Sequence, residues 1–495
     1  MTKIISSVNA IVWGAPALIM ILGVGLYLTV RLNAVQLRFL PKAFHQLAKM
    51  LHAKYSGGVS QIQALCTALA ATVGTGNLVG VAGALCLGGP GAIFWMWISG
   101  LLGMATKYAE TVLAVRFRVK NGSGYAGGPM YVMVQGLGQR FRPMAFVYCL
   151  FGIIAAFGVG NAAQISSAVA GINAILGREP TRTGNLLIGA VLAAFIGSLL
   201  FGGAKRIGAA AERLVPFAAA GYVAMCAAVL VLRAEAIPGA LYAIVHGAFS
   251  PKAVTGGMIG AAFQALRIGC SRGVFTNEAG MGTASIAHAS AEVAHPAEQG
   301  LMGILEVFLD TIVICTLTAL AILVSGVPIP YGRDMGAELT GLAFSGVLGR
   351  WASKAIGAAL VLFASATVLG WGLYGARCTE FLFGPGVWKW FSAAQILVIV
   401  ISSVADMADL WLLAETVNGL MALPNLITLA ALTSEVIRLT KEYIKPDEKT
   451  VSGGNYADFH QRKPLRTLSY EKVPPSGYGC QERGQKDLSP EHRSA

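Results

Sequence analysis

The sequence predicts an all-α polytopic membrane protein, and three observations lead to this fold class. Hydrophobic residues make up 55% of the 495 residues and charged residues only 12%, whereas a soluble domain carries about 25% charged residues. Apolar stretches long enough to cross a bilayer recur along the whole chain. The 61 glycines are many for a helical protein, and membrane helices accept glycine because it permits close packing.

About eleven spans are expected from these stretches. No small-residue cleavage site follows the first one, so we expect no cleavable signal. Pro424 falls inside the last stretch, which is therefore expected to be kinked or divided into a surface piece and a span. The expected spans lie near residues 9–31, 61–86, 91–116, 145–173, 185–203, 211–232, 255–287, 299–325, 353–381, 387–404 and 409–439.

The basic residues indicate how the chain crosses the membrane. The net charge of +13 could suggest nucleic acid, but the basic residues lie in loops and the tail, without interleaved aromatics. With the N-terminus outside and the C-terminus inside, 26 of the 37 basic residues fall on the cytoplasmic side, eight fall outside and three lie within spans. This asymmetry favours an N-out, C-in protein of the plasma (inner) membrane with an odd number of spans.

Several chemistries find no support in the sequence. It contains no Walker A loop, no HExxH, no GxSxG and no paired carboxylates at catalytic spacing within one span. Without a phosphate-binding loop, ATP cannot be the energy source within this chain, and we expect no enzyme. The eight cysteines stand singly without a CxxC, so neither a disulfide framework nor a metal knuckle is indicated.

The functional prediction depends on the stretch from Ala68 to Gly83, ALAATVGTGNLVGVAG. It is apolar enough to span, yet Gly74-Thr75-Gly76-Asn77 interrupts it with residues that favour unwound backbone over helix. Freed backbone groups are tolerated in a bilayer only where protein buries them or where they line a wet cavity. A broken helix at this depth indicates a solute site. Alternatively, Gly76 and Gly80 form a small-residue face that packs against a neighbouring helix.

A second interruption lies between Gly256 and Gly282. Arginine is costly at the bilayer centre, so we expect Arg267 and Arg272 in a water-filled cytoplasmic vestibule, with Gly269 near the break and Glu278 facing the arginines. The alternative is two short spans joined by a basic loop.

Two broken helices separated by four intact spans suggest five spans followed by five inverted spans, with one extra span before them. The expected division is an N-terminal span and basic loop at 1–58, a first five-helix repeat at 59–235 and a second, inverted repeat at 236–445. A polar cytoplasmic tail at 446–495 is expected to be disordered, because its composition cannot build a core.

Other spans can add polar groups to such a site. Asn161 and Gln164 are three residues apart and are expected to share a helix face, as are Thr367 and Trp371, four apart. Each has a structural alternative: amides join helices, and membrane threonines bond back to their own helix. Hydroxyl and carbonyl oxygens suit Na⁺. A proton-coupled site would instead use a carboxylate within a span, and the candidates are Glu306 and Asp310.

Several motifs resemble the alanine or glycine:cation symporter family over residues 10–440. They are AATVGTGN at 70–77, GGPGAIFWMW at 88–97, FTNEAGMG at 275–282, Gly370-Trp371 with Tyr374-Gly375, and Pro424-Asn425. The resemblance implies a LeuT-type fold of the amino acid-polyamine-cation superfamily. It also implies Na⁺-driven uptake of a small neutral amino acid, with Na⁺ as the coupling ion and a monomer in the lipid bilayer as sufficient unit.

The resemblance also implies particular site residues. The substrate-binding residues would be Thr72, Thr75, Gly76, Gln164, Phe263, Thr367 and Trp371. The Na⁺ ligands would be the carbonyls of Ala70, Val73 and Ala364 and the hydroxyl of Thr367. Val368 stands where the wider group has a second hydroxyl residue, so one cation ligand is missing from the pattern.

Two rival interpretations remain at this stage. Within transport, the rival is an H⁺-coupled or glutamine-preferring amino acid carrier of the same fold. The rival from another class is a membrane-embedded sensor or enzyme, which predicts signalling or product formation without accumulation of substrate.

Overall fold

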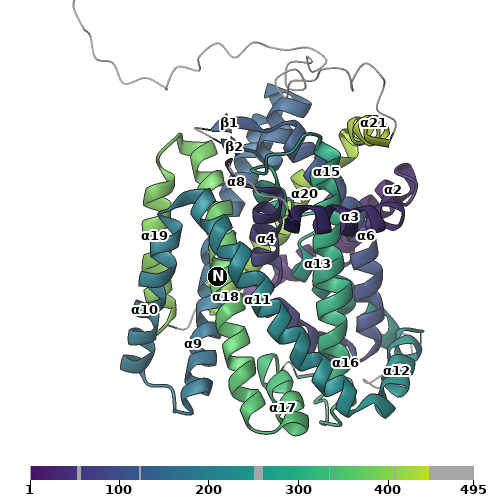
Figure 1. Cartoon of the computed structure of the whole chain (residues 1–495), viewed down its shortest axis with the longest axis vertical. Coiled ribbons are helices and arrows are strands. Elements are labelled where there is room, and N and C mark those ends of the chain that lie inside the picture. Colours follow the sequence, from purple (N-terminus) through teal and green to yellow (C-terminus); the bar gives the residue numbers. More distant parts are fainter. Residues whose placement is uncertain are drawn as a thin grey trace, which may run out of the picture. The chain divides into compact units, whose positions relative to one another are not determined.

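The computed structural model describes residues 2–52, 57–121, 124–249, 260–333, 335–405 and 408–444. Within this part, the chain is almost wholly helical (Figure 1), and its one sheet is a hairpin in which β1 (Val119–Asn121) pairs antiparallel with β2 (Gly124–Ala126). Residues 1–447 form one compact unit. The tail expected at 446–495 lies outside the described residues.

The helices before the second interruption are α1 (Thr2–Val12), α2 (Ala15–Arg31), α3 (Val35–His52), α4 (Gln61–Thr72), α5 (Val81–Gly88), α6 (Gly91–Arg116), α7 (Pro129–Tyr131), α8 (Arg142–Phe157), α9 (Ala163–Leu176), α10 (Arg182–Leu200), α11 (Gly203–Leu232) and α12 (Ile237–Phe249). Three π-helical turns, at Gly76–Gly80, Val132–Leu137 and Gly158–Ala162, and two 3₁₀ turns, at Gln139–Phe141 and Ala234–Ala236, lie between them.

The remaining helices are α13 (Gly260–Asn277), α14 (Thr283–His288), α15 (Pro296–Val307), α16 (Thr316–Val324), α17 (Ala337–Leu348), α18 (Trp351–Phe383), α19 (Trp388–Ser402), α20 (Ala408–Ala431) and α21 (Thr433–Ile444). A π-helical turn at Phe308–Cys315 joins α15 to α16. Pro424 lies inside α20, and α21 is a separate helix beyond it.

All eleven expected spans coincide with helical segments. By length and apolar composition, seven helical segments in the described ranges are able to cross a membrane, or eight if the bent pair Gln61–Thr72 and Gly76–Gly88 is one span. Three expected spans fall outside this count. α6 carries buried Lys107 and Glu110, α13 carries Arg267 and Arg272 within its 18 residues, and α19 has only 15 residues.

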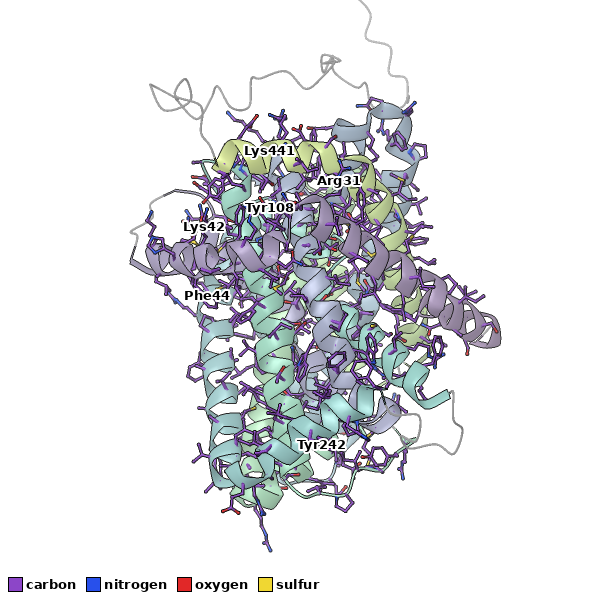
Figure 2. All side chains as sticks on the ribbon, turned by 90° about the vertical axis from the view of Figure 1, so that its right-hand side faces the viewer. Arg31, Lys42, Phe44, Tyr108, Tyr242 and Lys441 are labelled. Carbon is purple, nitrogen blue, oxygen red and sulfur yellow. The ribbon has the colours of Figure 1, made fainter. Side chains whose placement is uncertain are left out.

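The long helices run side by side, and their connections gather at two ends (Figure 1). The hairpin and α21 lie at one end, and α12 and α17 lie at the other. Helix α3 crosses the bundle near the first end, where Arg31 and Lys441 also lie (Figure 2). The loops that carry the excess of basic residues therefore share one end of the molecule.

The core of the bundle is built around α18. In its most apolar stretch, 83% of the residues are buried, more than in the other candidate spans. It packs against α4, α8, α9 and α11. Its neighbour α4 begins with a capping box, in which Ser60 and Gln63 exchange side-chain to backbone hydrogen bonds of 3.1 and 3.2 Å. This cap sets where α4 starts, twelve residues before the first break.

Candidate functional site

The first break separates α4 from the π-helical turn at Gly76–Gly80. Val73 ends α4 in an extended conformation, with φ −78° and ψ 90°. The Gly74 N–H then donates to the side-chain oxygen of Asn77 at 2.9 Å, so the sequence itself supplies the partner that a freed backbone group needs in a membrane. The segments before and after the break bend by 47°. The interrupted helix expected here is therefore present.

Helix α18 contacts the first break through Thr367. The hydroxyl donor lies 3.0 Å from the Ala70 carbonyl oxygen of α4 and 3.0 Å from the Phe363 carbonyl oxygen of its own helix. Gly74 makes this approach possible, because a Cβ there would lie 2.6 Å from the Thr367 hydroxyl oxygen. Both interpretations of Thr367 thus hold together: it bonds back to its own helix and it reaches the break.

The other two expected cation ligands belong to the same pair of helices. Val73 is the residue at which α4 ends, and Ala364 precedes Thr367 by one turn on α18. Both residues are buried. The last carbonyls of a helix have no partner within it, so an ending helix beside a hydroxyl presents oxygens of the kind that a hard cation takes.

Two expected substrate residues meet across the first break. The Thr75 hydroxyl donates to the side-chain oxygen of Gln164 at 3.1 Å, and the Gln164 amide donates to the Val159 carbonyl at 3.1 Å. Gly76 packs against α13, because a Cβ there would lie 3.1 Å from the methyl group of Thr276. The break, α9 and α13 therefore converge at this point.

Asn161 does not share the face of Gln164. Its side-chain amide donates to the backbone carbonyl of Gln395 on α19 at 2.9 Å and also to the side-chain oxygen of that residue. The cause is the π-helical turn at Gly158–Ala162, which changes the helical register between the two amides. Asn161 thus joins helices, while Gln164 faces the break.

The second break lies at 278–282, between α13 and α14. Glu278, Gly280 and Gly282 all have positive φ, of 53°, 94° and 78°. A left-handed residue other than glycine costs about 1–3 kcal/mol and persists only where its surroundings enforce it. The segment around Glu278 therefore needs external support.

Glu110 of α6 supplies that support. One of its carboxylate oxygens accepts hydrogen bonds from the backbone N–H of Gly280 at 2.9 Å, from that of Gly282 at 3.1 Å and from the side chain of Asn425 at 2.7 Å. Charge-assisted hydrogen bonds to backbone donors are the stronger kind. This buried carboxylate therefore fixes the shape of the second break.

The structure corrects the prediction for the second interruption. Gly269 is not near the break but inside α13, where it packs so closely on α6 that a Cβ would lie 2.2 Å from the Ala92 carbonyl oxygen. Arg267 and Arg272 precede Glu278 by about 16 and 9 Å of helix. The helix continues past Gly269 because α6 supports it, so the break begins nine residues later than expected.

Glu278 faces Trp371 instead of the arginines. The Trp371 indole N–H donates to one carboxylate oxygen at 3.1 Å, and the Thr283 hydroxyl donates to the other at 2.5 Å. Trp371 also packs on the π-helical turn before α9, since a Cβ at Gly160 would lie 2.3 Å from the Trp371 Cβ. One aromatic side chain therefore links α18, the second break and the start of α9.

Asp310 links the first break to the π-helical turn between α15 and α16. Its two carboxylate oxygens accept hydrogen bonds from the side chains of Asn77, at 2.7 Å, and Thr311, at 2.8 Å. The residue is fully buried. Among the ion pairs of the described residues, none joins Asp310 to a basic side chain. A carboxylate in this setting favours a bound cation or a proton.

A buried ionic cluster lies beside the second break. Lys107 Nζ is 3.4 Å from one oxygen of Glu306, and His288 Nε2 is 2.8 Å from the other. The side-chain amide of Gln299 lies 2.8 Å from His288 Nδ1, so the His288 Nε2 proton is directed at Glu306. The three charged or titratable side chains are fully buried. The cluster therefore ties α6, α14 and α15 together.

The polar interior of the bundle is rich in carboxyl groups. Among the described residues, the buried carboxyl groups are those of Glu110, Glu278, Glu306 and Asp310, and the buried lysine and arginine are Lys107 and Arg118. Carboxyl oxygens are ligands for hard cations rather than for anions.

The structure brings most of the expected site residues together, and one is elsewhere. Phe263 lies in the first turn of α13, 56% exposed, because the unbroken α13 carries it about 22 Å before the second break. Thr72 is buried but donates back to the Ala68 carbonyl at 3.2 Å. Glu110 was not expected at the site, and Glu278 was expected there only as a partner of the arginines. The sequence feature that could have identified both residues is a single acidic residue inside an otherwise apolar or glycine-rich span.

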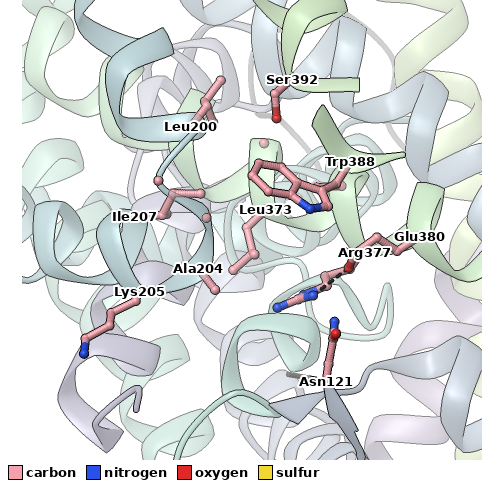
Figure 3. A pocket seen from close by; sticks show the side chains of 14 residues that line it. Asn121, Leu200, Ala204, Lys205, Ile207, Leu373, Arg377, Glu380, Trp388 and Ser392 are labelled. Carbon is pink, nitrogen blue, oxygen red and sulfur yellow. Dashed lines mark hydrogen bonds and ion pairs between the residues drawn. The ribbon is translucent and has the colours of Figure 1, made fainter. Parts of the chain in front are cut away.

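An open cavity of about 390 Å³ lies beyond this site (Figure 3). It is bordered by the turn between α10 and α11, the end of α18 and the start of α19. The Arg377 side chain pairs with Glu380 at 2.6 Å in its wall. Its lining contains no residue of either break, but it includes Gly372, the residue after Trp371. The cavity thus reaches α18 at the residue next to Trp371.

Two broken helices at the centre of a multi-pass bundle, beside a helix that presents the Thr367 hydroxyl, define the class of membrane proteins with a LeuT-type fold. A solved structure shares this fold: the crystal structure of MhsT in complex with L-phenylalanine matches with a TM-score of 0.51 and 15% sequence identity. The match covers 78% of this chain and 99% of that one. At this identity the likeness concerns the fold alone.

Sequence comparison identifies the family. Residues 1–455 match the model of the sodium:alanine symporter family. The chain is 41% identical over 448 residues to the sodium/alanine symporter AgcS of Methanococcus maripaludis, covering 89% of this chain and 97% of that protein. It is 36% identical over 446 residues to the probable sodium/glutamine symporter GlnT of Bacillus subtilis, covering 89% and 90%. This chain belongs to the sodium:alanine symporter family, and it is a transporter rather than an enzyme.

Proposed function

We propose that this protein couples Na⁺ influx to the uptake of alanine or glycine by alternating access. The observation that carries the proposal is the contact of Thr367 with Ala70, made beside Gly74 at a helix break in the buried centre of the bundle. Family membership supports an amino acid as the substrate. The small-substrate preference rests on the confined space around Trp371 and Gln164, which are both buried.

Na⁺ would bind between α4 and α18. Its ligands would be the carbonyl oxygens of Ala70, Val73 and Ala364 and the Thr367 hydroxyl oxygen. These oxygens carry no formal charge, so the site would hold a monovalent ion weakly enough to release it. The buried carboxyl groups described above would favour a cation over an anion nearby.

The substrate would bind on the other side of the first break. The backbone N–H groups of Thr75 and Gly76 lie where the next helical segment begins, and the positive end of the helix dipole suits the substrate carboxylate. Thr72, Gln164, Thr367 and Trp371 complete the proposed pocket. A methyl or hydrogen side chain would fit there, and a longer one would meet the indole of Trp371.

The proposed cycle uses the first break as a hinge. The five-helix units at 59–235 and 236–445 would together alternate access to the site, and the N-terminus would lie outside with the C-terminus in the cytoplasm of the plasma membrane. The shared end of the basic loops supports this orientation.

Counterflow in proteoliposomes tests the proposal. Proteoliposomes that contain the purified protein and are loaded with unlabelled alanine should accumulate radiolabelled alanine. An inward Na⁺ gradient should drive net uptake, and replacing Na⁺ with choline should abolish it. Competition by unlabelled amino acids then ranks alanine, glycine and glutamine. Equal uptake in Na⁺ and in choline at fixed pH would overturn Na⁺ coupling.

A proton-coupled carrier is the second candidate, and Asp310 is the observation that favours it. Its buried carboxylate has hydrogen-bond partners but no basic one among the described ion pairs. In that case an inward proton gradient without Na⁺ should drive alanine uptake, and Asp310→Asn should abolish the pH dependence. Persistence of the pH dependence in Asp310→Asn would remove this candidate.

A further inference from the structure

Helix α3 has three distinct faces along its length. The face toward the bundle is apolar and buried, at Val35, Phe39 and Ala43. A second face is exposed and apolar, and its residues are Leu37, Pro41, Phe44, Ala48 and Leu51. A third face is exposed and basic, and its residues are Arg38, Lys42, His45 and Lys49. Each set recurs every three or four residues and so forms a continuous stripe, and the last two stripes are about 100° apart.

Specific contacts hold α3 against the bundle. The Phe39 ring meets Tyr108 of α6 edge to face, with ring centres 6.1 Å apart. The Gln46 side chain donates to the side-chain oxygen of Gln61 at 3.1 Å, at the start of α4. These contacts fix the rotation of the helix about its axis, so the two exposed stripes have fixed directions.

The two exposed stripes face different surroundings. Figure 2 shows Lys42 on the side of α3 toward the end of the bundle marked by Arg31 and Lys441, and Phe44 on the opposite side. Phe44 packs edge to face on Phe308, with ring centres 5.6 Å apart, and remains 41% exposed. The apolar stripe is therefore turned toward the flank of the span-forming helices, while the basic stripe is turned toward their end.

We propose that α3 is an interfacial helix that binds the headgroups of anionic phospholipids. A helix lying across the bundle with one apolar and one basic exposed stripe matches the boundary between acyl chains and headgroups. The sequence of α3 contains no acidic residue, and no ion pair of the described residues involves Arg38 or Lys42. Their charge is therefore available to lipid phosphate, and Lys42 keeps its ammonium 5.0 Å from the centre of the Phe39 ring.

Lipid binding at α3 would act on the first broken span. A cavity of about 430 Å³ lies between α3 and the start of α4, and its walls include Lys49, Gln61, Glu212 and Glu292. Because α3 forms one wall of this cavity, fixing α3 at the membrane surface fixes the space into which the start of α4 can move. The lipid would thereby influence how readily α4 changes position during transport.

A thermal-stability titration tests the proposal without any substrate. The full chain in neutral detergent is titrated with phosphatidylglycerol, and the rise in Tm gives an apparent affinity. Arg38→Gln with Lys42→Gln should weaken this affinity on the order of 10- to 30-fold. The matched control, Arg350→Gln with Lys354→Gln, removes two exposed charges at the start of α18 and should leave the affinity unchanged.

Three further arms identify the ligand. Phosphatidylcholine should raise Tm much less than phosphatidylglycerol, glycerol phosphate without acyl chains should have no effect, and 0.5 M KCl should reduce the response. An unchanged response of the Arg38 and Lys42 variant, or an equal loss in the control variant, would overturn the proposal. A change in oligomeric mass with the lipid response intact would assign the surface to a second copy and would overturn it as well.

Discussion

The two helix breaks are stabilised by different chemistry. At 73–75 the groups that contact the backbone directly are neutral, namely the Asn77 amide and the Thr367 hydroxyl, and the Asp310 carboxylate acts one step away by accepting from the Asn77 amide. At 278–282 a formal charge holds the chain, because the Glu110 carboxylate takes two backbone donors and Asn425. The first break also contains no left-handed residue, whereas the second contains three.

This difference suggests that the first break binds ligands and that the second break maintains the shape of the site. Neutral oxygens in direct contact with the first break suit a partner that must bind and leave. A buried carboxylate at the second break suits a shape that must not change locally. We therefore expect substitutions around the first break to alter affinity for ion or substrate, and substitutions around the second to disable the site as a whole.

The largest effect is expected for Glu110→Ala. Three buried donors would lose their acceptor, and each unsatisfied group costs about 1–3 kcal/mol. Uptake of alanine should fall at least about 100-fold and Tm should drop, as measured by transport in proteoliposomes and by thermal denaturation. Glu110→Gln should retain part of the uptake and part of the thermal stability. The control Glu338→Ala, at an exposed position of α17, should have unchanged uptake and Tm. Normal uptake by Glu110→Ala would show that the second helix break does not depend on this carboxylate.

A smaller and more selective effect is expected for Thr367→Val. Losing one hydroxyl ligand should raise the Na⁺ concentration for half-maximal uptake about tenfold, which corresponds to about 1.4 kcal/mol. Protein yield in the membrane should not change, and Thr367→Ser, which keeps the hydroxyl, should restore the Na⁺ response. An unaltered Na⁺ dependence in Thr367→Val removes the residue from the cation site.

Trp371→Phe tests the link between the two breaks. The substitution removes the indole N–H that donates to Glu278 while leaving an aromatic wall. The loss of one hydrogen bond to a charged group, worth about 1.5–3 kcal/mol, should raise KM for alanine roughly 10-fold and should admit larger substrates such as glutamine. Competition assays measure both effects. An unchanged substrate range would place Trp371 outside the pocket.

The smallest effect is expected for Thr75→Val. It removes the 3.1 Å hydrogen bond to Gln164, a neutral contact worth about 0.5–1.5 kcal/mol. KM for alanine should therefore rise about 2- to 10-fold, with the half-maximal Na⁺ concentration unchanged. A parallel shift in Na⁺ dependence would show that ion and substrate sites share this residue, and Thr75→Ser serves as the control.

The sequence predicted the first break better than the second. Two glycines around a hydroxyl, followed by an amide, interrupt an apolar run, and Asn77 satisfies Gly74 locally, so the signal lies within four residues. At the second break the expected position was wrong by about nine residues, because Gly269 owes its presence to packing on Ala92 of α6. The support from Glu110, 170 residues away, depends on long-range contacts that a local pattern does not contain. Asn161 was misplaced for a related reason, since a π-helical turn shifts the helix face.

The buried cluster of Lys107, His288 and Glu306 has a mechanical consequence. Removing one partner from a buried ion pair costs about 3–5 kcal/mol. Separating these side chains would leave charged groups buried without a partner and without water. Helices α6, α14 and α15 must then travel as a single rigid block. Helix α13 packs closely on α6 at Gly269, so α13 and the second break would move together with that block.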